Sequence, residues 1–202
     1  MKKLISLLES ILKIKSKLFQ ILFCILIFAS SQISASEKWI IDKNISYIKF
    51  ELPVLFAKNV KGEFKKIDGF VEIDRDDKIN NKAIISVDIS SIEINYKKYL
   101  DLLLSEIFFD LERYPLGVID TKKFKYQNEN EILISVELFI KGTSREIPIL
   151  IKVNELGKDL VQIITNFEFS RTDYNIGVGQ WSNTTILKDN AKIGVNIFLF
   201  KE

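Results

Sequence analysis

The sequence contains no histidine and a single cysteine, Cys24, among its 202 residues. These absences exclude zinc sites built from Cys and His, Cys–His nucleophiles and Ser-His-Asp triads. We therefore predict no metal site, no disulfide and no catalytic residue, although chemistry carried by carboxylates alone stays open.

Glycine, with 8 residues, and proline, with 3, are also scarce, whereas the sequence holds 15 phenylalanines. Apolar residues make up 47% of the chain and charged residues 28%, which is a globular composition. Phe, Ile and Val favour strands and contribute large buried surfaces. The composition therefore predicts one strand-rich domain with a substantial core.

The N-terminal segment has the pattern of an export signal. Residues 1–17 carry five lysines against one glutamate, residues 18–29 are uncharged and mostly apolar, and small residues follow up to Ala35. This order is typical of a secretory signal peptide, and the apolar run is shorter than the ~20 residues of a spanning helix. We predict that residues 1–35 are a signal peptide cleaved after Ala35 and that the protein is periplasmic. A retained membrane anchor is the alternative.

Removal of residues 1–35 changes the sign of the net charge. The whole chain has 29 basic and 27 acidic residues; the segment holds five and one, which leaves 24 and 26 and a charge of −2. A near-neutral domain offers no electrostatic basis for nucleic-acid binding. We also expect no stable membrane insertion after cleavage, and a homodimer is one candidate assembly.

From Trp39 onward, apolar residues recur with a period of two, which indicates strands with one buried face. Five regular runs and three less regular ones predict eight strands. They are 39–52, 61–74, 82–90, 118–127, 131–141, 146–153, 161–169 and 193–199. Gly62 and Gly69 suggest a bulge or bend in the second strand.

One stretch breaks this period. From Tyr96 to Asp110 the apolar residues follow helical spacing, with Asn95 as the expected N-cap, and Pro115 ends any continuation. We predict one helix, or two short ones, between the third and fourth strands. The fold class is therefore all-β, an eight-stranded antiparallel, lipocalin-like barrel with a helical insert, in one domain over residues 37–202.

Several short segments carry a further signal through their identity and order. They are Trp39-Ile40-Ile41-Asp42, Val60-Lys61-Gly62-Glu63-Phe64, Ser91-Ile92-Glu93, Leu104-Ser105-Glu106-Ile107-Phe108-Phe109-Asp110 with Tyr114-Pro115, Ile140-Lys141-Gly142-Thr143 and Arg171-Thr172-Asp173-Tyr174-Asn175-Ile176-Gly177-Val178-Gly179. Together they resemble the YceI-like family of bacterial periplasmic proteins. Ile45, where the family often has histidine, and Asn175 depart from its pattern.

The resemblance implies a non-enzymatic protein that binds a polyisoprenoid or a similar long apolar lipid, with a bound isoprenoid or quinone in place of a cofactor. An apolar barrel interior can bury such a chain. The residues expected to line it are Ile48, Phe50, Phe64, Val87, Phe108, Phe109, Phe124, Val136, Leu138 and Phe167. Lys141, Arg145 and Arg171 are the candidates for contact with a headgroup.

Two other functions stay open from the sequence. An integral outer-membrane barrel needs a lipid-facing apolar exterior, but the non-core faces of the predicted strands carry charged residues such as Lys49, Glu137 and Lys152. A barrel enzyme would need paired carboxylates, for which Asp101, Glu106, Asp110 and Glu112 are the nearest candidates.

Overall fold

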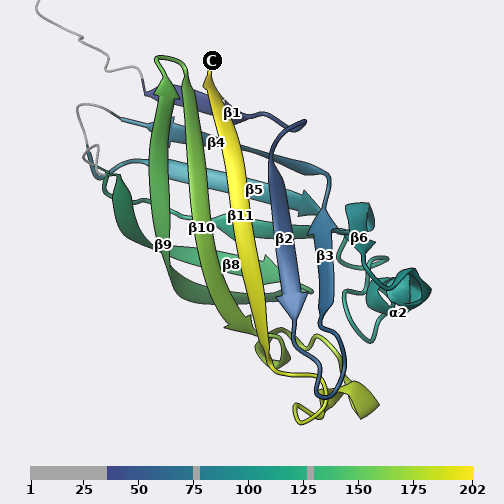
Figure 1. Ribbon diagram of the computed structural model, residues 1–202. Helices are drawn as coiled ribbons and strands as arrows, with labels where there is room; N and C mark the ends of the chain where they lie inside the picture. Colours follow the sequence, from purple (N-terminus) through teal and green to yellow (C-terminus); the bar gives the residue numbers. More distant parts are fainter. Residues whose placement is uncertain (1–35, 75–77, 127–129) are drawn as a thin grey trace, which may run out of the picture. The chain divides into compact units, whose positions relative to one another are not determined.

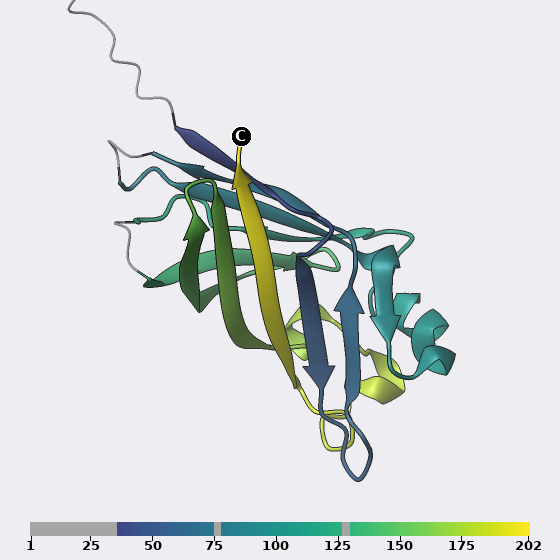
Figure 2. The same cartoon turned by 45° about the horizontal axis from the view of Figure 1, so that its top comes forward.

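The computed structural model describes residues 36–74, 78–126 and 130–202. The predicted signal peptide, 1–35, lies outside the described residues. Figure 1 shows the barrel from its side and Figure 2 turns the same view by 45°. No helix within the described ranges is long and apolar enough to cross a membrane.

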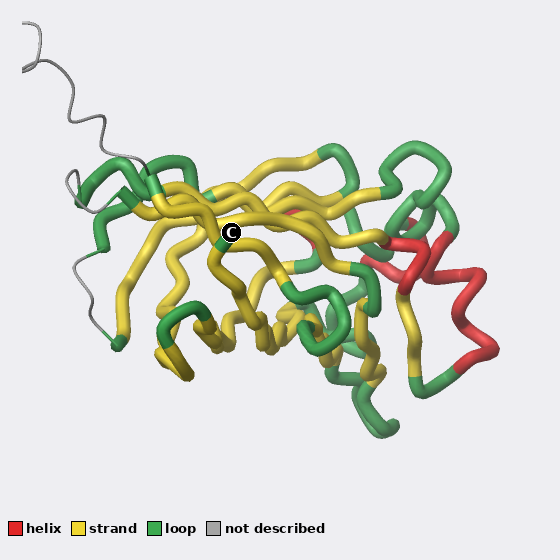
Figure 3. Tube along the Cα trace, turned by 90° about the horizontal axis from the view of Figure 1, so that it is seen from above, coloured by secondary structure: helices red, strands yellow, loops and turns green. Residues whose placement is uncertain are grey.

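The described residues form eleven strands in one antiparallel sheet. They are β1 (Glu37–Ile41), β2 (Tyr47–Leu52), β3 (Val60–Phe64), β4 (Ile67–Ile73), β5 (Lys82–Asp88), β6 (Ile92–Ile94), β7 (Leu116–Asp120), β8 (Glu131–Ile140), β9 (Thr143–Gly157), β10 (Leu160–Ser170) and β11 (Asn190–Lys201). The order β1-β4-β5-β7-β8-β9-β10-β11 closes into a ring because β1 also pairs with β11. The predicted eight-stranded antiparallel barrel is therefore confirmed, and Figure 3 shows it from above.

The three extra strands continue long strands that are interrupted partway. β2 extends β1 along the same edge of β11, β3 extends β4 against β2, and β6 extends β5 against β3. The break between β1 and β2 is held by Ser46, whose hydroxyl accepts a hydrogen bond from the Phe198 amide at 3.0 Å. The break between β3 and β4 is held by Ser91, whose hydroxyl accepts hydrogen bonds from the amides of Lys65 and Lys66. At these breaks the chain changes direction, and β2, β3 and β6 form a ladder beside β11 in the order β11-β2-β3-β6.

Buried and exposed residues alternate along β8, as the sequence predicts. Along β8 the even-numbered residues Ile132 to Ile140 are all buried, while most odd-numbered ones are exposed. The predicted fourth strand is shorter than expected and ends at Asp120, whose carboxylate accepts from the Lys122 amide at 2.6 Å. Lys122 has a positive φ of 51°, so the chain leaves the sheet there.

The helical insert is confirmed between β6 and β7, but its helices are shorter than the spacing predicts. A 3₁₀ turn, η2 (Lys97–Tyr99), leads into the α-helix α2 (Leu100–Leu104), and turns follow up to Asp110. The predicted N-cap Asn95 is wrong: its side chain instead accepts from the Lys61 amide and donates to the Asn59 carbonyl, both at 3.0 Å. The remaining 3₁₀ turns are η1 (Ile89–Ser91), η3 (Thr172–Tyr174) and η4 (Gly179–Ser182).

The interior of the barrel has two differently packed ends. The end that carries β1 and the C-terminus of β11 is closed by buried aliphatic side chains, and we call it the filled end. Its residues are Ile41, Val71, Ala83, Ile132, Ile134, Val136, Ile149, Ile151, Val153, Val195, Ile197 and Leu199. The opposite end, where β2, β3, the insert and the loop 171–189 lie, contains a cavity, and we call it the cavity end.

Candidate ligand-binding cavity

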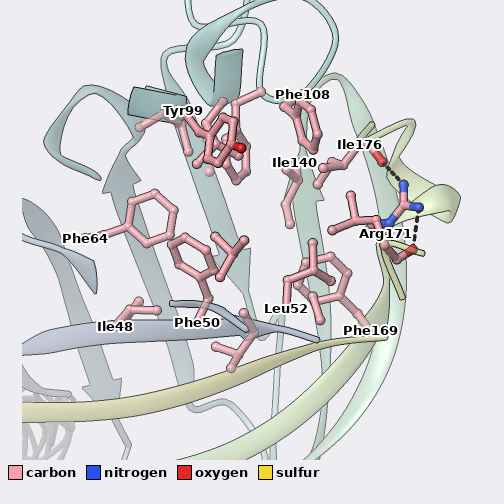
Figure 4. A pocket seen from close by; sticks show the side chains of 18 of the residues that line it. Ile48, Phe50, Leu52, Phe64, Tyr99, Phe108, Ile140, Phe169, Arg171 and Ile176 are labelled. Atoms are coloured by element: carbon pink, nitrogen blue, oxygen red, sulfur yellow. Dashed lines mark hydrogen bonds between the residues drawn. The ribbon is translucent and has the colours of Figure 1, made fainter. Parts of the chain in front are cut away.

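A cavity of about 380 Å³ occupies the cavity end of the barrel. Its wall combines inward-facing strand residues with residues of the insert and of the loop 171–189, as Figure 4 shows. This volume lies within the ~300–1,000 Å³ typical of small-molecule sites. The barrel interior is therefore not completely filled by its own side chains.

The strand register places the floor of this cavity. On β10 and β11 the paired residues Phe167 and Ile193 line the cavity, whereas the next inward pair, Thr165 and Val195, does not. The hydroxyl of buried Thr165 donates to the Leu150 carbonyl at 2.8 Å, so it presents no free polar group there. The cavity thus ends on the packed layer of the filled end.

Aromatic rings form much of the cavity wall. The ring centroid of Phe64 lies 5.7 Å from that of Phe50 and 6.1 Å from that of Phe109, which joins β2, β3 and the insert. Phe50 pairs with Gly62 across β2 and β3, and a Cβ at Gly62 would overlap its ring. The glycine that signalled a bend therefore also makes room for an inward-facing phenylalanine.

The insert covers a gap in the strand wall. β6 pairs with β3 on one edge, and its other edge faces no described strand, because β7 pairs with β5 and β8 instead. Side chains of the insert line the cavity at this gap: Tyr96, Tyr99, Leu102, Leu103, Phe108 and Phe109. The insert thus replaces a strand with apolar and aromatic side chains.

Eight of the ten residues predicted to line the interior lie on the cavity wall. They are Ile48, Phe50, Phe64, Val87, Phe108, Phe109, Leu138 and Phe167. Val136 does not, because it lies one inward position beyond Leu138, within the filled end. Phe124 does not either: it forms an isolated bridge with Asn81 after β7 has ended. Contact of the eight with a lipid stays a prediction.

Sequence reasoning missed several wall residues. Phe169 and Ile140 continue the alternation of predicted strands, so the period alone contained the signal for them. Tyr99, Ile176 and Trp181 come from the insert and the loop 171–189, where no period indicates which side chain faces inward. Figure 4 shows Tyr99 and Ile176 beside the predicted residues.

Arg171 is the predicted headgroup residue that lines the cavity, and it is 1% exposed. Its guanidinium donates to four backbone carbonyls, those of Lys188 at 3.0 Å, Ile176 at 2.8 Å, Leu187 at 2.9 Å and Gly177 at 3.3 Å. Burial lowers its pKa. Arg171 thus ties the two ends of the loop 171–189 together, and a headgroup contact remains a prediction for it.

The other two predicted headgroup residues lie off the cavity wall. The Lys141 ammonium donates to the carbonyls of Glu106 and Asn175, both at 2.7 Å, and burial lowers its pKa. It therefore joins the insert to the loop 171–189. Arg145 is exposed on β9.

Charged and polar groups in the wall are few. Among the described residues, the charged side chains that line the cavity are Lys58, Lys98 and Arg171, with no carboxylate. Trp181 also lines it, and its buried indole N–H has no hydrogen-bond partner within the described residues. A buried donor without a partner is costly unless a ligand or water supplies an acceptor.

The candidate carboxylates of the insert do not converge on this cavity. Asp110 is buried and paired with Arg113, whose guanidinium lies 2.6 Å from its carboxylate, while Asp101, Glu106 and Glu112 lie on the insert away from the wall. The barrel exterior instead carries ion pairs such as Lys61–Glu51 at 2.9 Å and Lys122–Glu137 at 3.0 Å. This polarity is the reverse of a lipid-facing exterior around a polar lumen.

Comparison with known proteins places this arrangement in a family. The model of the YceI-like domain matches residues 39–199. A UPF0312 protein of Photorhabdus laumondii is 25% identical over 135 residues, which cover 67% of this chain and 70% of that one. A UPF0312 protein of Staphylococcus epidermidis is 28% identical over 162 residues, covering 79% and 92%.

Solved structures share the fold. BcnA of Burkholderia cenocepacia aligns with a TM-score of 0.71 at 22% identity, over 78% of this chain and 98% of that one. A domain from Saccharophagus degradans described as polyisoprenoid-binding gives 0.66 at 12% identity, over 81% and 98%. The YceI protein of Campylobacter jejuni gives 0.64 at 20% identity, over 74% and 89%.

Proposed function

Because this chain belongs to the YceI-like domain family, we propose that it is a binding protein whose barrel holds the tail of an isoprenoid-type lipid. The observation that carries the proposal is the cavity itself, which is walled by aromatic and aliphatic side chains and, among the described residues, by no carboxylate. Burial of an apolar chain is favourable by about 25 cal/mol per Å² of surface removed from water.

The cavity volume sets how much of a lipid enters. Since a water-sized group occupies about 30 Å³, a cavity of about 380 Å³ accommodates roughly a dozen carbon atoms of a chain. That is between two and three isoprene units, and the filled end blocks deeper entry. The barrel therefore holds one end of a polyisoprenoid, and the rest of a longer chain extends out of the cavity.

When the chain is short enough to be held whole, its polar end lies near the loop 171–189. Trp181 offers an N–H donor without a partner among the described residues, and Arg171 contributes a buried positive charge in the same wall. A hydroxyl, carbonyl or phosphate oxygen supplies the acceptor that this N–H requires. The site thus combines apolar recognition of the tail with a small number of polar contacts.

The proposed place of action is the periplasm, which follows from the basic and apolar N-terminal residues of the sequence. The N-terminal sequence of the protein recovered from its own cells tests this step. We expect it to begin at Ser36, and a chain that still starts at Met1 would contradict cleavage.

Native mass spectrometry of the protein purified from its own cells, followed by organic extraction, tests the proposed ligand. We expect one bound molecule per chain, and we expect its extracted mass to fit a polyprenyl chain. Protein that carries no lipid, or that carries only fatty acids or phospholipids, would overturn the isoprenoid assignment.

A further inference from the structure

The exposed part of the cavity wall marks its mouth. Of the wall residues, Ala57, Lys58, Lys98, Tyr99 and Ile186 are exposed. All five belong to three segments, residues 53–59, 95–100 and 178–188, which we call the rim. The rim surrounds the opening through which any ligand must pass.

Apolar side chains project from this rim into solvent. Phe56 is 99% exposed, and Ile186 is 59% exposed. The two are carried on one short ladder, because the Leu55 amide donates to the Ile186 carbonyl at 2.8 Å and the Lys188 amide donates to the Pro53 carbonyl at 3.0 Å. Isolated exposed apolar residues are ordinary, but these two lie on one ladder beside the cavity mouth.

The backbone at Phe56 also sets this residue apart from ordinary exposed apolar residues. Its φ is +58°, in the left-handed region that bulky side chains rarely adopt and that Asn or Gly fits better. Its nearly complete exposure means that its ring gains little from packing within the protein. The fold therefore keeps a phenylalanine at a strained and exposed position where it contributes little to the stability of the domain.

The rim also has one sign of charge. Its segments contain Lys58, Lys97, Lys98 and Lys188 and no acidic residue. On the barrel exterior, lysines such as Lys61 and Lys122 lie within salt-bridge distance of carboxylates, but no described acidic side chain lies within that distance of the four rim lysines. The rim is thus a local positive surface on a domain whose net charge is −2 once residues 1–35 are removed.

We propose that the rim docks on the surface of an anionic phospholipid bilayer. Exposed apolar side chains beside lysines that have no salt-bridge partner among the described residues are the combination that binds such surfaces, since the apolar groups enter the interface and the lysines meet the phosphates. Docking in this orientation points the cavity mouth at the bilayer, so a lipid tail passes between bilayer and barrel with little exposure to water. This inference goes beyond the proposed ligand, because the empty protein also docks.

Sedimentation with vesicles of phosphatidylcholine and phosphatidylglycerol tests the docking. The rim variant combines Phe56→Asn, Lys97→Gln and Lys188→Gln, three residues outside the cavity wall, and Asn suits the positive φ at position 56. The control variant combines Leu133→Asn, Lys152→Gln and Lys158→Gln, exposed residues remote from the rim. We expect the rim variant to lose about tenfold in vesicle partitioning, and the control variant to match the wild type. Equal partitioning of both variants would overturn the proposal.

The two tryptophans report which end touches the membrane. Trp39 lies on β1 at the filled end, and Trp181 lies in the rim, so the variants Trp39→Phe and Trp181→Phe each leave one reporter. Both are made with Gly117→Leu, which places a leucine side chain in the cavity wall so that a lipid tail competes less for Trp181 from inside. Brominated phospholipids should quench Trp181 strongly and Trp39 little. Stronger quenching of Trp39 would contradict the orientation. If the wild type docks on vesicles but binds no prenyl alcohol, only the proposed function is overturned.

Discussion

Within a single strand, β11 passes from the cavity end to the filled end in four residues. Ile193 lines the cavity beside Phe50 and Phe167, whereas Ile197 is 1% exposed and is enclosed by other aliphatic side chains. The filled end carries mainly Ile and Val, whereas the cavity end adds the rings of Phe50, Phe64 and Phe109 to its aliphatic residues. Both positions carry isoleucine, so the side chains of the neighbouring strands, and not the residue on β11 itself, decide whether the interior is solid or open.

The largest expected difference between the two ends is in stability. Ile197→Ala should lower the free energy of unfolding by about 3 kcal/mol, because it opens a new cavity in a packed layer. Ile193→Ala on the same strand should cost only about 1 kcal/mol, since its side chain already faces open space. Urea unfolding measures both, and equal losses would mean that the two ends are packed alike.

Narrowing the cavity should weaken binding without loss of stability. A Cβ at Gly117 would meet its nearest atoms at 3.7 and 3.8 Å, so a leucine at this wall position begins without overlap and takes up part of the cavity. We expect the affinity for farnesol to fall at least about tenfold, which corresponds to ~1.4 kcal/mol. Fluorescence of Trp181 in the Trp39→Phe variant follows the titration.

The control for this substitution is Gly157→Leu, at the end of β9, where a Cβ has no neighbour within 4 Å. It introduces the same side chain, with the same restriction of the unfolded chain, but leaves the cavity empty. Its farnesol affinity should equal that of the wild type. If Gly117→Leu binds as well as this control, the ligand does not occupy the cavity.

A series of prenyl alcohols should show where the filled end stops the chain. Each buried CH₂ contributes about 0.8 kcal/mol, so affinity should rise steeply from one isoprene unit to about three. Beyond three units the added carbons lie outside the cavity, and the dissociation constant should change less than about threefold. A constant increase per unit up to long chains would show that the filled end opens to admit them.

The smallest expected effect is that of pH between 5 and 8, because the chain has no histidine to titrate there. Below this range the cavity end should weaken. Burial alone raises the pKa of Asp189, but hydrogen bonds from Ser170 and Thr172 outweigh it, so the pKa lies below the ordinary 3.8. Its stabilising contribution is complete above pH ~4 and is lost as the pH falls through the lowered value.

Urea unfolding at several pH values, compared with Asp189→Asn, measures this contribution. The wild type should hold its free energy of unfolding from pH 5 to 8 and lose it below pH 4, and the variant should show a shallower acid slope. A marked change between pH 6 and 7 would contradict this expectation, because it would require another group that titrates in that range.

The fold could be predicted because the barrel depends on a simple period. Along β8 and β11, alternation alone assigns the buried face, and the number and order of the long strands follow from it. Tertiary contacts decide the rest. Ser46 and Ser91 accept backbone amides across the sheet, which interrupts strands that the sequence shows as continuous.

The candidate site could be predicted only in part, for the same reason. Inward-facing strand residues such as Phe50 and Leu138 are visible in the sequence, but the level at which the cavity ends is not. Val136 continues the alternation of Leu138 along β8 but is packed within the filled end. An inward-facing position in the sequence therefore does not show whether a side chain borders the cavity. Loop residues such as Trp181 have no period, so only their three-dimensional position shows their orientation.

The most direct test of an open cavity end beside a closed filled end is an anomalous difference map from crystals grown with 15-bromopentadecan-1-ol. We expect one bromine peak inside the barrel, near Ile48, Ile119 and Leu138, where the cavity meets the filled end. A peak among Ile134, Ile151 and Ile197, or bromine found only on the outer surface, would contradict it.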